Sequence, residues 1–442
     1  MKSLSSTTRL AAQRLTLSTL SCALTLIAAQ PAVAAMSSLG TLPGTPGHIT
    51  EAQAVSANGL VVVGQAGNGW DTQMFRWQAS QGFSKIGPMY ARPFARAQAV
   101  NRNGQVIVGA APITAYNLRP GSPDWNLQAY RWNSAEGFAF LGTLGGASSG
   151  AYGVSSDGNA IAGYANNAAG KQRAFRWTKA SGMLDLGSLP GQDSSFAFGI
   201  SGDGTVVVGY SGTYMYDSQP FRWDQASSTM MKLPCISQMG GEAHAANQDG
   251  SVVVGQCWRS LPNGSVRQTA FYWSIFGAMD YVIEPGSTDD RRSTAYAVNM
   301  FGSAVVGELG NEAVLWSRNG QTMLGKLPGT DYSRATGVSD YGDVVVGVSG
   351  NSAFIWTPAV KTVQNLSSLQ NSLIRSVAAV MQAVRGDRSE SPQASLVQVQ
   401  PANASKAATL SCAVQLTTGC VPVASRTALP SPYLGSIASL SN

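Results

Sequence analysis

Residues 197–209 read Ala-Phe-Gly-Ile-Ser-Gly-Asp-Gly-Thr-Val-Val-Val-Gly, and residues 220–223 read Pro-Phe-Arg-Trp. Together they hold three elements: an alanine start of the form Ala-x-(Ala/Gly), an apolar run closed by glycine, and an aromatic or apolar residue two places before a tryptophan. All three recur seven times along the chain, always in the same order. The sequence is therefore built from seven copies of one unit of about 48 residues.

The recurring positions can be followed in the printed sequence. The alanine elements begin at Ala52, Ala97, Ala151, Ala197, Ala243, Ala295 and Ala335. The closing glycines are Gly64, Gly109, Gly163, Gly209, Gly255, Gly307 and Gly347. The tryptophans are Trp77, Trp132, Trp177, Trp223, Trp273, Trp316 and Trp356. Their regular recurrence indicates that the tryptophans are core residues.

Each unit is predicted to form four short strands, which in the third copy are residues 151–155, 159–164, 174–177 and 183–186. Between the first two strands, Gly158 provides the left-handed residue that closes a type I turn as a hairpin bulge. The Asp-Gly pairs at this position are turn residues, since a calcium loop would need alternating oxygen ligands.

A four-stranded unit with apolar side chains on both faces cannot bury them alone, so neighbouring units must pack against each other. Radial closure leaves no long exposed sheet edge. The sequence therefore predicts an all-β fold, a seven-bladed β-propeller of four-stranded repeats over residues 36–369. Either residues 38–42 or residues 361–366 could supply a closing strand. A β-solenoid is the alternative architecture.

The motifs at residues 186–191, 197–204, 206–209 and 220–223 resemble the HAF-type extracellular repeat. That family is found in bacterial exported proteins, some of them autotransporter passengers, and the resemblance covers about residues 37–369. It implies an extracellular repeat protein and provides no catalytic signature. The chain departs from the autotransporter form, since the roughly 70 residues after the last repeat are too few for a membrane barrel.

Residues 1–35 have the pattern of a signal peptide, with a basic start, an apolar stretch too short to span a bilayer, and small residues before a cut after Ala34 or Ala35. Lipidation at Cys22 is the less favoured alternative. Removing three basic residues with this segment lowers the net charge from +6 to +3. We therefore expect a secreted or periplasmic monomer with no nucleic-acid partner and no transmembrane segment.

Four cysteines remain after cleavage: Cys235, Cys257, Cys412 and Cys420. An even number in an exported chain permits two disulfides, and sequence proximity favours the pairs 235–257 and 412–420. Buried free thiols are the alternative. After the repeats, residues 370–386 are predicted to form a helix, and residues 387–442 form a low-complexity tail that contains the second cysteine pair.

Residues with catalytic chemistry are scarce. The only histidines, His48 and His244, are interpreted as structural, and no spacing typical of a zinc site or a nucleophile elbow occurs. No metal, cofactor or catalytic residue is predicted. The arginines that precede four of the tryptophans are interpreted as blade-edge contacts: Arg76, Arg131, Arg176 and Arg222.

The loops between second and third strands and between repeats lie on one face and vary in length, whereas the Asp-Gly turns on the other face do not. These variable loops collect aromatic and charged residues outside the repeat pattern, as a carbohydrate or protein surface would. The candidate ligand-binding residues are Tyr90, Arg92, Tyr116, Trp125, Trp258, Arg291, Tyr332 and Arg334.

The sequence favours an exported, non-enzymatic binding or adhesion module whose partner is a glycan or a surface protein. An enzyme such as a propeller glycosidase or lyase is an alternative, with carboxylates drawn from Asp193, Glu242, Asp289 or Asp331. A structural remnant of an autotransporter passenger is another. Fold alone cannot choose between these functions, because propellers serve many unrelated activities.

Overall fold

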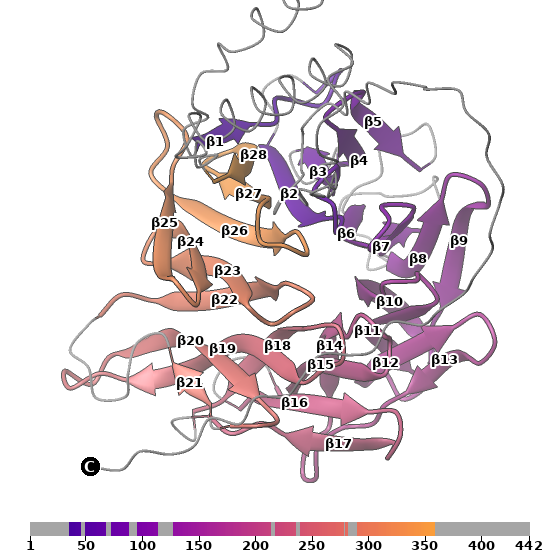
Figure 1. Cartoon of the computed structure of the whole chain (residues 1–442). Coiled ribbons are helices and arrows are strands. Elements are labelled where there is room, and N and C mark those ends of the chain that lie inside the picture. Colours follow the sequence, from indigo (N-terminus) through magenta and orange to yellow (C-terminus); the bar gives the residue numbers. More distant parts are fainter. Residues whose placement is uncertain are drawn as a thin grey trace, which may run out of the picture. The chain divides into compact units, whose positions relative to one another are not determined.

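The computed structural model describes residues 35–45, 49–67, 72–87, 95–113, 127–213, 217–235, 239–277, 279–281 and 290–358. In these residues the elements of secondary structure are all β-strands, and the 28 strands form seven four-stranded antiparallel sheets. Figure 1 shows the sheets arranged around a common centre, as the blades of a propeller. The predicted all-β, seven-bladed β-propeller is confirmed.

The blades are numbered in chain order and described from the innermost strand outward. Blade 1 consists of β2 (Ile49–Val55), β3 (Val61–Gly67), β4 (Gln73–Gln78) and β5 (Gly82–Ile86). Blade 2 consists of β6 (Arg96–Val100), β7 (Val106–Pro112), β8 (Leu127–Asn133) and β9 (Gly137–Gly142). Blade 3 consists of β10 (Gly145–Val154), β11 (Ala160–Asn167), β12 (Gln172–Thr178) and β13 (Gly182–Asp185). Blade 4 consists of β14 (Ser195–Ile200), β15 (Val206–Ser211), β16 (Gln219–Asp224) and β17 (Thr229–Lys232). Blade 5 consists of β18 (Gly241–Ala246), β19 (Val252–Ser260), β20 (Val266–Ser274) and β21 (Asp280–Tyr281). Blade 6 consists of β22 (Ser293–Val298), β23 (Ala304–Leu309), β24 (Glu312–Ser317) and β25 (Gly320–Gly325). Blade 7 is β26 (Ser333–Val338), β27 (Val345–Ser349), β28 (Ser352–Thr357) and β1 (Ala35–Ser38).

The ring is closed by the N-terminal strand. Strand β1 pairs with β28 as the outermost strand of blade 7, with Met36 opposite Trp356. Strand β2 packs against β26 and β27, and Thr336 Oγ1 donates a hydrogen bond to the Ala52 carbonyl at 2.8 Å across the closure. A solenoid would leave these ends apart, so that alternative is excluded. Of the two predicted closing segments, residues 361–366 lie outside the described residues.

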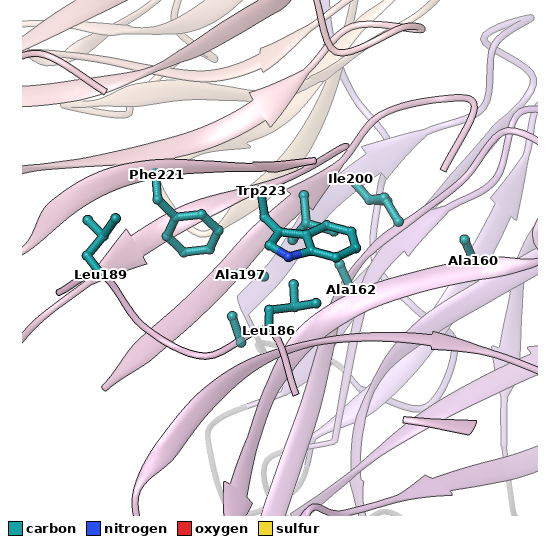
Figure 2. Close-up of a cluster of buried hydrophobic side chains, with 10 residues drawn as sticks. Ala160, Ala162, Leu186, Leu189, Ala197, Ile200, Phe221 and Trp223 are labelled. Atoms are coloured by element: carbon teal, nitrogen blue, oxygen red, sulfur yellow. The ribbon is translucent and has the colours of Figure 1, made fainter. Parts of the chain in front are cut away.

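The blades are joined by apolar cores that include the predicted aromatic and tryptophan positions. Between blades 3 and 4, Phe221 is completely buried and Trp223 is 3% exposed, and both pack with Leu186 and Leu189 of the inter-repeat segment (Figure 2). Serine hydroxyls add polar links between blades: Ser195 Oγ, for example, accepts the amide of Ala174 at 2.8 Å. Burying one such aromatic side chain stabilises the fold by about 2–3 kcal/mol.

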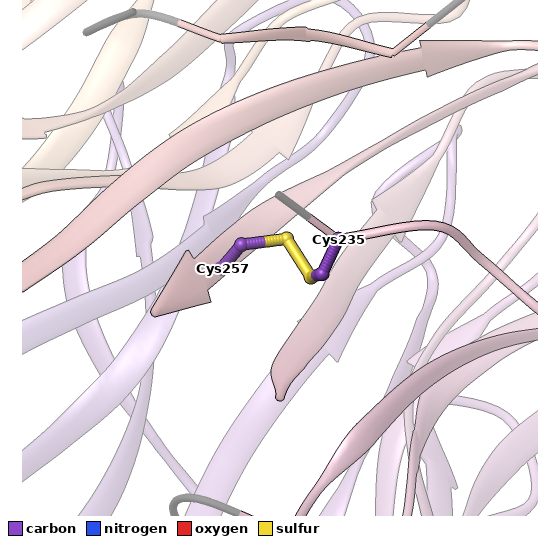
Figure 3. Close-up of a disulfide and its surroundings, with 2 residues drawn as sticks. All are labelled: Cys235 and Cys257. Atoms are coloured by element: carbon purple, nitrogen blue, oxygen red, sulfur yellow. A yellow bond between two sulfur atoms is a disulfide. The ribbon is translucent and has the colours of Figure 1, made fainter. Parts of the chain in front are cut away.

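The predicted disulfide between Cys235 and Cys257 is present (Figure 3). It ties the segment between blades 4 and 5 to strand β19, with a Cα–Cα distance of 5.7 Å. Cys412, Cys420, the predicted helix 370–386 and the tail 387–442 lie outside the described residues. Within the described part of the chain, no helix is long and apolar enough to cross a membrane.

Three of the four recurring arginines of the third strands contact the next blade, whereas Arg76 donates to Gln78 of its own strand. Arg176 Nε donates to the Gly204 carbonyl at 2.8 Å, and Arg222 Nε donates to the Gly250 carbonyl at 3.1 Å. Arg131 Nε reaches the Gly158 carbonyl at 3.4 Å. Each of these three guanidinium groups therefore holds the Asp-Gly turn of the following blade.

Candidate functional site

The seven innermost strands carry the same irregularity. In each blade, the pairing of the first strand with the second skips one residue, so this residue forms a β-bulge. The bulge residue is always the x of the Ala-x-(Ala/Gly) element. We call these seven residues the bulge ring: Gln53, Gln98, Tyr152, Phe198, His244, Tyr296 and Thr336. The repeat therefore leaves one variable residue per blade outside the regular pairing of the innermost strand, where a bulge can redirect its side chain.

The closing glycines of the second strands explain why the bulge fits. A Cβ atom at Gly209 would overlap the Phe196 carbonyl oxygen, which is drawn close by the bulge. The equivalent carbonyl blocks a Cβ at the other six closing glycines too: Gly64, Gly109, Gly163, Gly255, Gly307 and Gly347. These glycines are therefore required for close backbone approach, not for an unusual φ angle.

The bulge ring and its neighbours form an aromatic arc over blades 3 to 6. We define this arc by its members: Tyr152, Tyr164, Phe196, Phe198, Tyr210, His244 and Tyr296.

The rings of the aromatic arc contact each other in series. In blades 3 and 4, the Phe196 ring stacks on Tyr164, with centroids 4.9 Å apart, and lies 4.8 Å from Tyr152. Phe198 then meets the edge of His244 at 5.1 Å, and His244 stacks on Tyr296 at 5.5 Å. Tyr152 and Phe198 remain half-buried and so leave part of their rings accessible.

Polar and charged side chains form a second arc, which overlaps the aromatic arc in blades 5 and 6. We define this polar arc by its members, from blade 5 round to blade 2: Glu242, Gln256, Thr294, Glu308, Arg334, Glu51, Gln65 and Arg96.

Hydrogen bonds connect part of the polar arc in blades 5 and 6. Gln256 Nε2 donates to Glu242 at 3.0 Å within blade 5, and Thr294 Oγ1 of blade 6 donates to Gln256 Oε1 at 2.8 Å. Within blade 6, Arg292 pairs with Glu308 at 3.1 Å. The aromatic and polar arcs therefore meet in blades 5 and 6.

His244 links the two arcs. Its Nδ1 atom lies 2.9 Å from the Ala295 carbonyl, which can only accept, so Nδ1 carries a proton. Its Nε2 atom lies 3.3 Å from a carboxylate oxygen of Glu242. The His244 ring therefore connects the backbone of blade 6 with Glu242 of its own blade. The structural role expected of His244 stays a prediction.

Burial changes the protonation behaviour of this region. Desolvation raises the pKa of Tyr152 to about 12, with Tyr164 adding to the rise and Arg96 opposing it. Desolvation also raises the pKa of Glu308, although Arg292 and Arg334 counteract it. A carboxyl group whose charged form is disfavoured by burial is typical of functional sites as well as of ion-pair networks.

At the opposite end of the innermost strands, the Asp-Gly turns form a hydrogen-bonded circle, which we call the turn ring. Backbone bonds join five of the seven neighbouring pairs of turns, such as Ser156 N to Gly202 O at 2.8 Å and Asp340 N to Ala57 O at 3.0 Å. Asparagine side chains join the other two, Asn101 to Ser156 and Asn299 to Asp340. The turns are thereby drawn together around the axis.

Four of the predicted ligand-binding residues fall outside the described residues: Tyr90, Arg92, Tyr116 and Trp125. Trp258 is partly buried on β19, and Arg291 and Tyr332 are exposed before β22 and β26. The Tyr332 hydroxyl donates to the Gly350 carbonyl at 2.8 Å. Arg334 belongs to the polar arc and not to a loop. The described residues therefore do not bring the predicted loop set together as one site.

The carboxylates considered for an enzyme are also dispersed. Asp193 is exposed and pairs with Lys171 at 2.7 Å, and Asp331 is exposed. Glu242 lies in the polar arc, whereas Asp289 and also His48 lie outside the described residues. Within the described part of the chain, no group of three His, Cys, Asp or Glu residues could hold a metal ion.

A separate cavity of about 330 Å³ lies between blades 5 and 6. Its lining includes Tyr272, Trp316 and Phe301, and it opens where Tyr272 replaces the recurring third-strand arginine. Two of its lining residues, Asp280 and Tyr281, stand in the sequence between residues 278 and 282–289, which lie outside the described residues. We therefore place the candidate site at the two arcs, which are complete in the described chain.

No protein-family model matches the sequence, and no curated protein matches it. Solved structures with a similar arrangement include a putative TolB from Agrobacterium tumefaciens, with 14% identity over 71% of this chain and 91% of that chain and a TM-score of 0.39. TolB from Acinetobacter baumannii has 12% identity over 70% of this chain and 63% of that chain, with a TM-score of 0.38. Neither likeness bears on what this chain binds.

Proposed function

We propose that this protein is an exported, non-enzymatic binding module of the HAF-repeat type that holds its ligand at the bulge ring and the arcs around it. One observation carries the proposal. Every blade keeps a bulge and an obligatory glycine on its two inner strands, and the residue in the bulge ranges from threonine to phenylalanine. A purely structural position would not need such variety.

Export is supported by the signal-peptide pattern of residues 1–35 and by the disulfide at Cys235 and Cys257. Disulfides persist in the periplasm and outside the cell, where thiols are not kept reduced. The variable loops remain candidates for contacts with a larger partner around the central site.

The proposal is tested by ligand-observed NMR with a chemically mixed library of sugars, amino acids, nucleosides and aryl compounds. Compounds that give a binding signal with the mature protein should give no such signal with the double variant Tyr152→Ala/Phe198→Ala. They should keep it in Phe276→Ala, which removes an aromatic ring that is 86% exposed on an outer turn. Binding that survives in the double variant, or no binder in the library, would contradict the proposal.

A glycosidase is the second candidate, because the polar arc holds two buried carboxyl groups in different surroundings. Glu242 contacts His244 and Gln256, while burial raises the pKa of Glu308. Paired carboxyl groups with different environments are the usual acid and base of glycoside hydrolysis. Release of reducing ends from oligosaccharides, abolished in Glu242→Gln and Glu308→Gln, would favour the enzyme over the binding module.

A further inference from the structure

The cavity between blades 5 and 6 lies at a position that an arginine occupies in other blades. In blades 2, 3 and 4, the Nε atoms of Arg131, Arg176 and Arg222 donate to the carbonyl of the turn glycine in the next blade. In blade 5 the same position is Tyr272, and the turn glycine of blade 6 is Gly302. Both residues line the cavity of about 330 Å³. The cavity therefore lies where three other blades place a guanidinium group that this position of blade 5 does not supply.

The other two blades without this arginine fill the position differently. It is Leu315 in blade 6 and Ile355 in blade 7, and both side chains pack against the buried apolar clusters beside them. Blade 5 differs from them, because Tyr272 keeps a polar hydroxyl and has a cavity beside it.

The arginine sites also show which charge accompanies the guanidinium. Arg131 pairs with Glu136 at 2.6 Å, and the equivalent arginine of blade 4 pairs with Asp224 at 3.0 Å, each within its own blade. Blade 5 supplies a carboxylate from its outermost strand, where Asp280 stands directly opposite Tyr272 and lines the cavity. The cavity therefore combines the two features that hold a guanidinium elsewhere: the turn glycine of the next blade and a carboxylate of the same blade.

One cation also lines the cavity, and the repeat shows that it is compatible with a bound guanidinium. Arg318 stands two residues after the third-strand tryptophan of blade 6, and Lys179 has the same position in blade 3. The Arg131 guanidinium bonds to the turn of blade 3 with Lys179 nearby: Arg131 lowers the pKa of Glu136 most, and Lys179 lowers it too. Arg318 is exposed, so water and salt screen its charge.

Aromatic rings form much of the remaining wall. Tyr272, Phe301 and Trp316 line the cavity, and Phe301 is 56% exposed. Burial raises the pKa of Tyr272, with Asp280 adding to the rise and Arg318 opposing it, so the phenol stays neutral at physiological pH. A guanidinium is planar, weakly hydrated and able to stack on aromatic faces, whereas an ammonium group is more strongly hydrated.

We propose that this cavity binds a guanidinium group supplied from outside the chain, either in a small guanidinium compound or in the arginine side chain of a partner. Its N–H groups bond to the Asp280 carboxylate and to the Gly302 turn, and its flat face rests on the aromatic wall. A volume of about 330 Å³ is at the lower end of the range for small-molecule sites and suits a group of this size. The inference does not depend on the function proposed for the bulge ring.

The test is a ligand-observed NMR titration of the mature protein with two guanidinium probes, ethylguanidinium and N-acetylarginine amide. N-acetylcitrulline amide, which has the same shape without the charge, and N-acetyllysine amide are the matched controls. The guanidinium probes should bind, and the controls should bind at least tenfold more weakly. Tighter binding of the arginine amide than of ethylguanidinium would identify a partner's arginine as the source, and the reverse would identify a small compound.

Two substitutions locate the binding in the cavity. Asp280→Asn should weaken guanidinium binding at least tenfold and lower the melting temperature by no more than a few degrees, because the side chain is exposed. Tyr272→Arg supplies the guanidinium from the chain itself and should abolish probe binding in a folded protein. Asp185→Asn is the matched control and should leave binding unchanged, because it removes an exposed carboxylate from the outermost strand of blade 3, where Arg176 already occupies the site.

Equal binding of the citrulline and arginine amides would show that the cavity does not recognise the charge, which overturns the inference. Tighter binding of the lysine amide, or no binding of any probe, would overturn it as well. Binding that Asp280→Asn and Tyr272→Arg leave unchanged would place the probe elsewhere and have the same consequence. If Tyr272→Arg does not fold, the response to Asp280→Asn decides.

Discussion

The bulge ring and the turn ring lie on the same seven hairpins, yet they vary in opposite ways. The turn ring repeats one geometry: Gly59, Gly104, Gly158, Gly204, Gly250, Gly302 and Gly342 all have positive φ. The bulge ring repeats only its backbone, because its side chains range from threonine and glutamine to tyrosine, phenylalanine and histidine. The turns are bonded to each other, so a change in one disturbs its neighbours. The bulge side chains make different contacts: Thr336 and His244 bond to the backbone of the next blade, whereas Tyr152 and Phe198 pack against other rings.

The largest loss of stability is expected at a closing glycine of a second strand, which the bulge requires. Gly209→Val should overlap the Phe196 carbonyl and destabilise the protein by about 4 kcal/mol or more, because backbone must move. Chemical denaturation measures this. Gly277→Ala, where nothing lies within 4 Å of the new Cβ atom, should stay within about 0.5 kcal/mol of the parent. Similar unfolding free energies for the two variants would contradict the explanation of why the bulge needs glycine.

The disulfide separates fold stability from the central site. The double variant Cys235→Ala/Cys257→Ala opens a loop with a sequence separation of 22, so it should cost about 3 kcal/mol of unfolding free energy. Ligand affinity of the folded fraction should not change, since the bridge lies outside both arcs. Urea denaturation and calorimetry give the two values. A loss of affinity without loss of stability would couple the disulfide to the site.

The pH dependence of stability tests the burial of Glu308. Burial raises its pKa in the folded protein above the ordinary value of 4.5, so the folded state binds this proton more tightly than the unfolded state. Its contribution to stability is therefore most favourable below pH 4.5 and is lost as the pH rises through the folded pKa.

Glu308→Gln should remove that loss, and the variant should be at least as stable as the parent at neutral pH. The lost pair with Arg292 matters little, because that guanidinium is half exposed. Melting curves across the acidic range compare the two proteins. A variant that becomes less stable only at neutral pH would show instead that the charged form of Glu308 supports the fold.

The fold could be predicted from the sequence because the same four-strand pattern occurs seven times. The third-copy turn and the aromatic position before Trp177 specify a hairpin and a core face by local rules. The closing strand was less predictable, since segments before and after the repeats both resembled a fourth strand. The structure uses Ala35–Ser38, slightly before the predicted N-terminal segment.

The bulge ring was not predicted from the sequence, for a physical reason. Simple alternation places Tyr152 and Phe198 on one face of a strand, whereas a bulge inserts one residue and can redirect its side chain. The signal was nonetheless in the sequence: x was the one unrestrained position between two small residues, and the alanine before it pairs with the obligatory glycine. The loops favoured instead contain Tyr116 and Trp125, which lie outside the described residues.

The central claim is that bulge residues are interchangeable for folding but not for binding. The most direct measurement is calorimetric binding, to Phe198→Gln, of a compound that the library screen identifies, because this variant gives blade 4 the residue that blades 1 and 2 already carry as Gln53 and Gln98. We predict a variant within about 1 kcal/mol of the parent in stability and at least tenfold weaker in binding. A variant that fails to fold, or one that binds as the parent does, would contradict the claim.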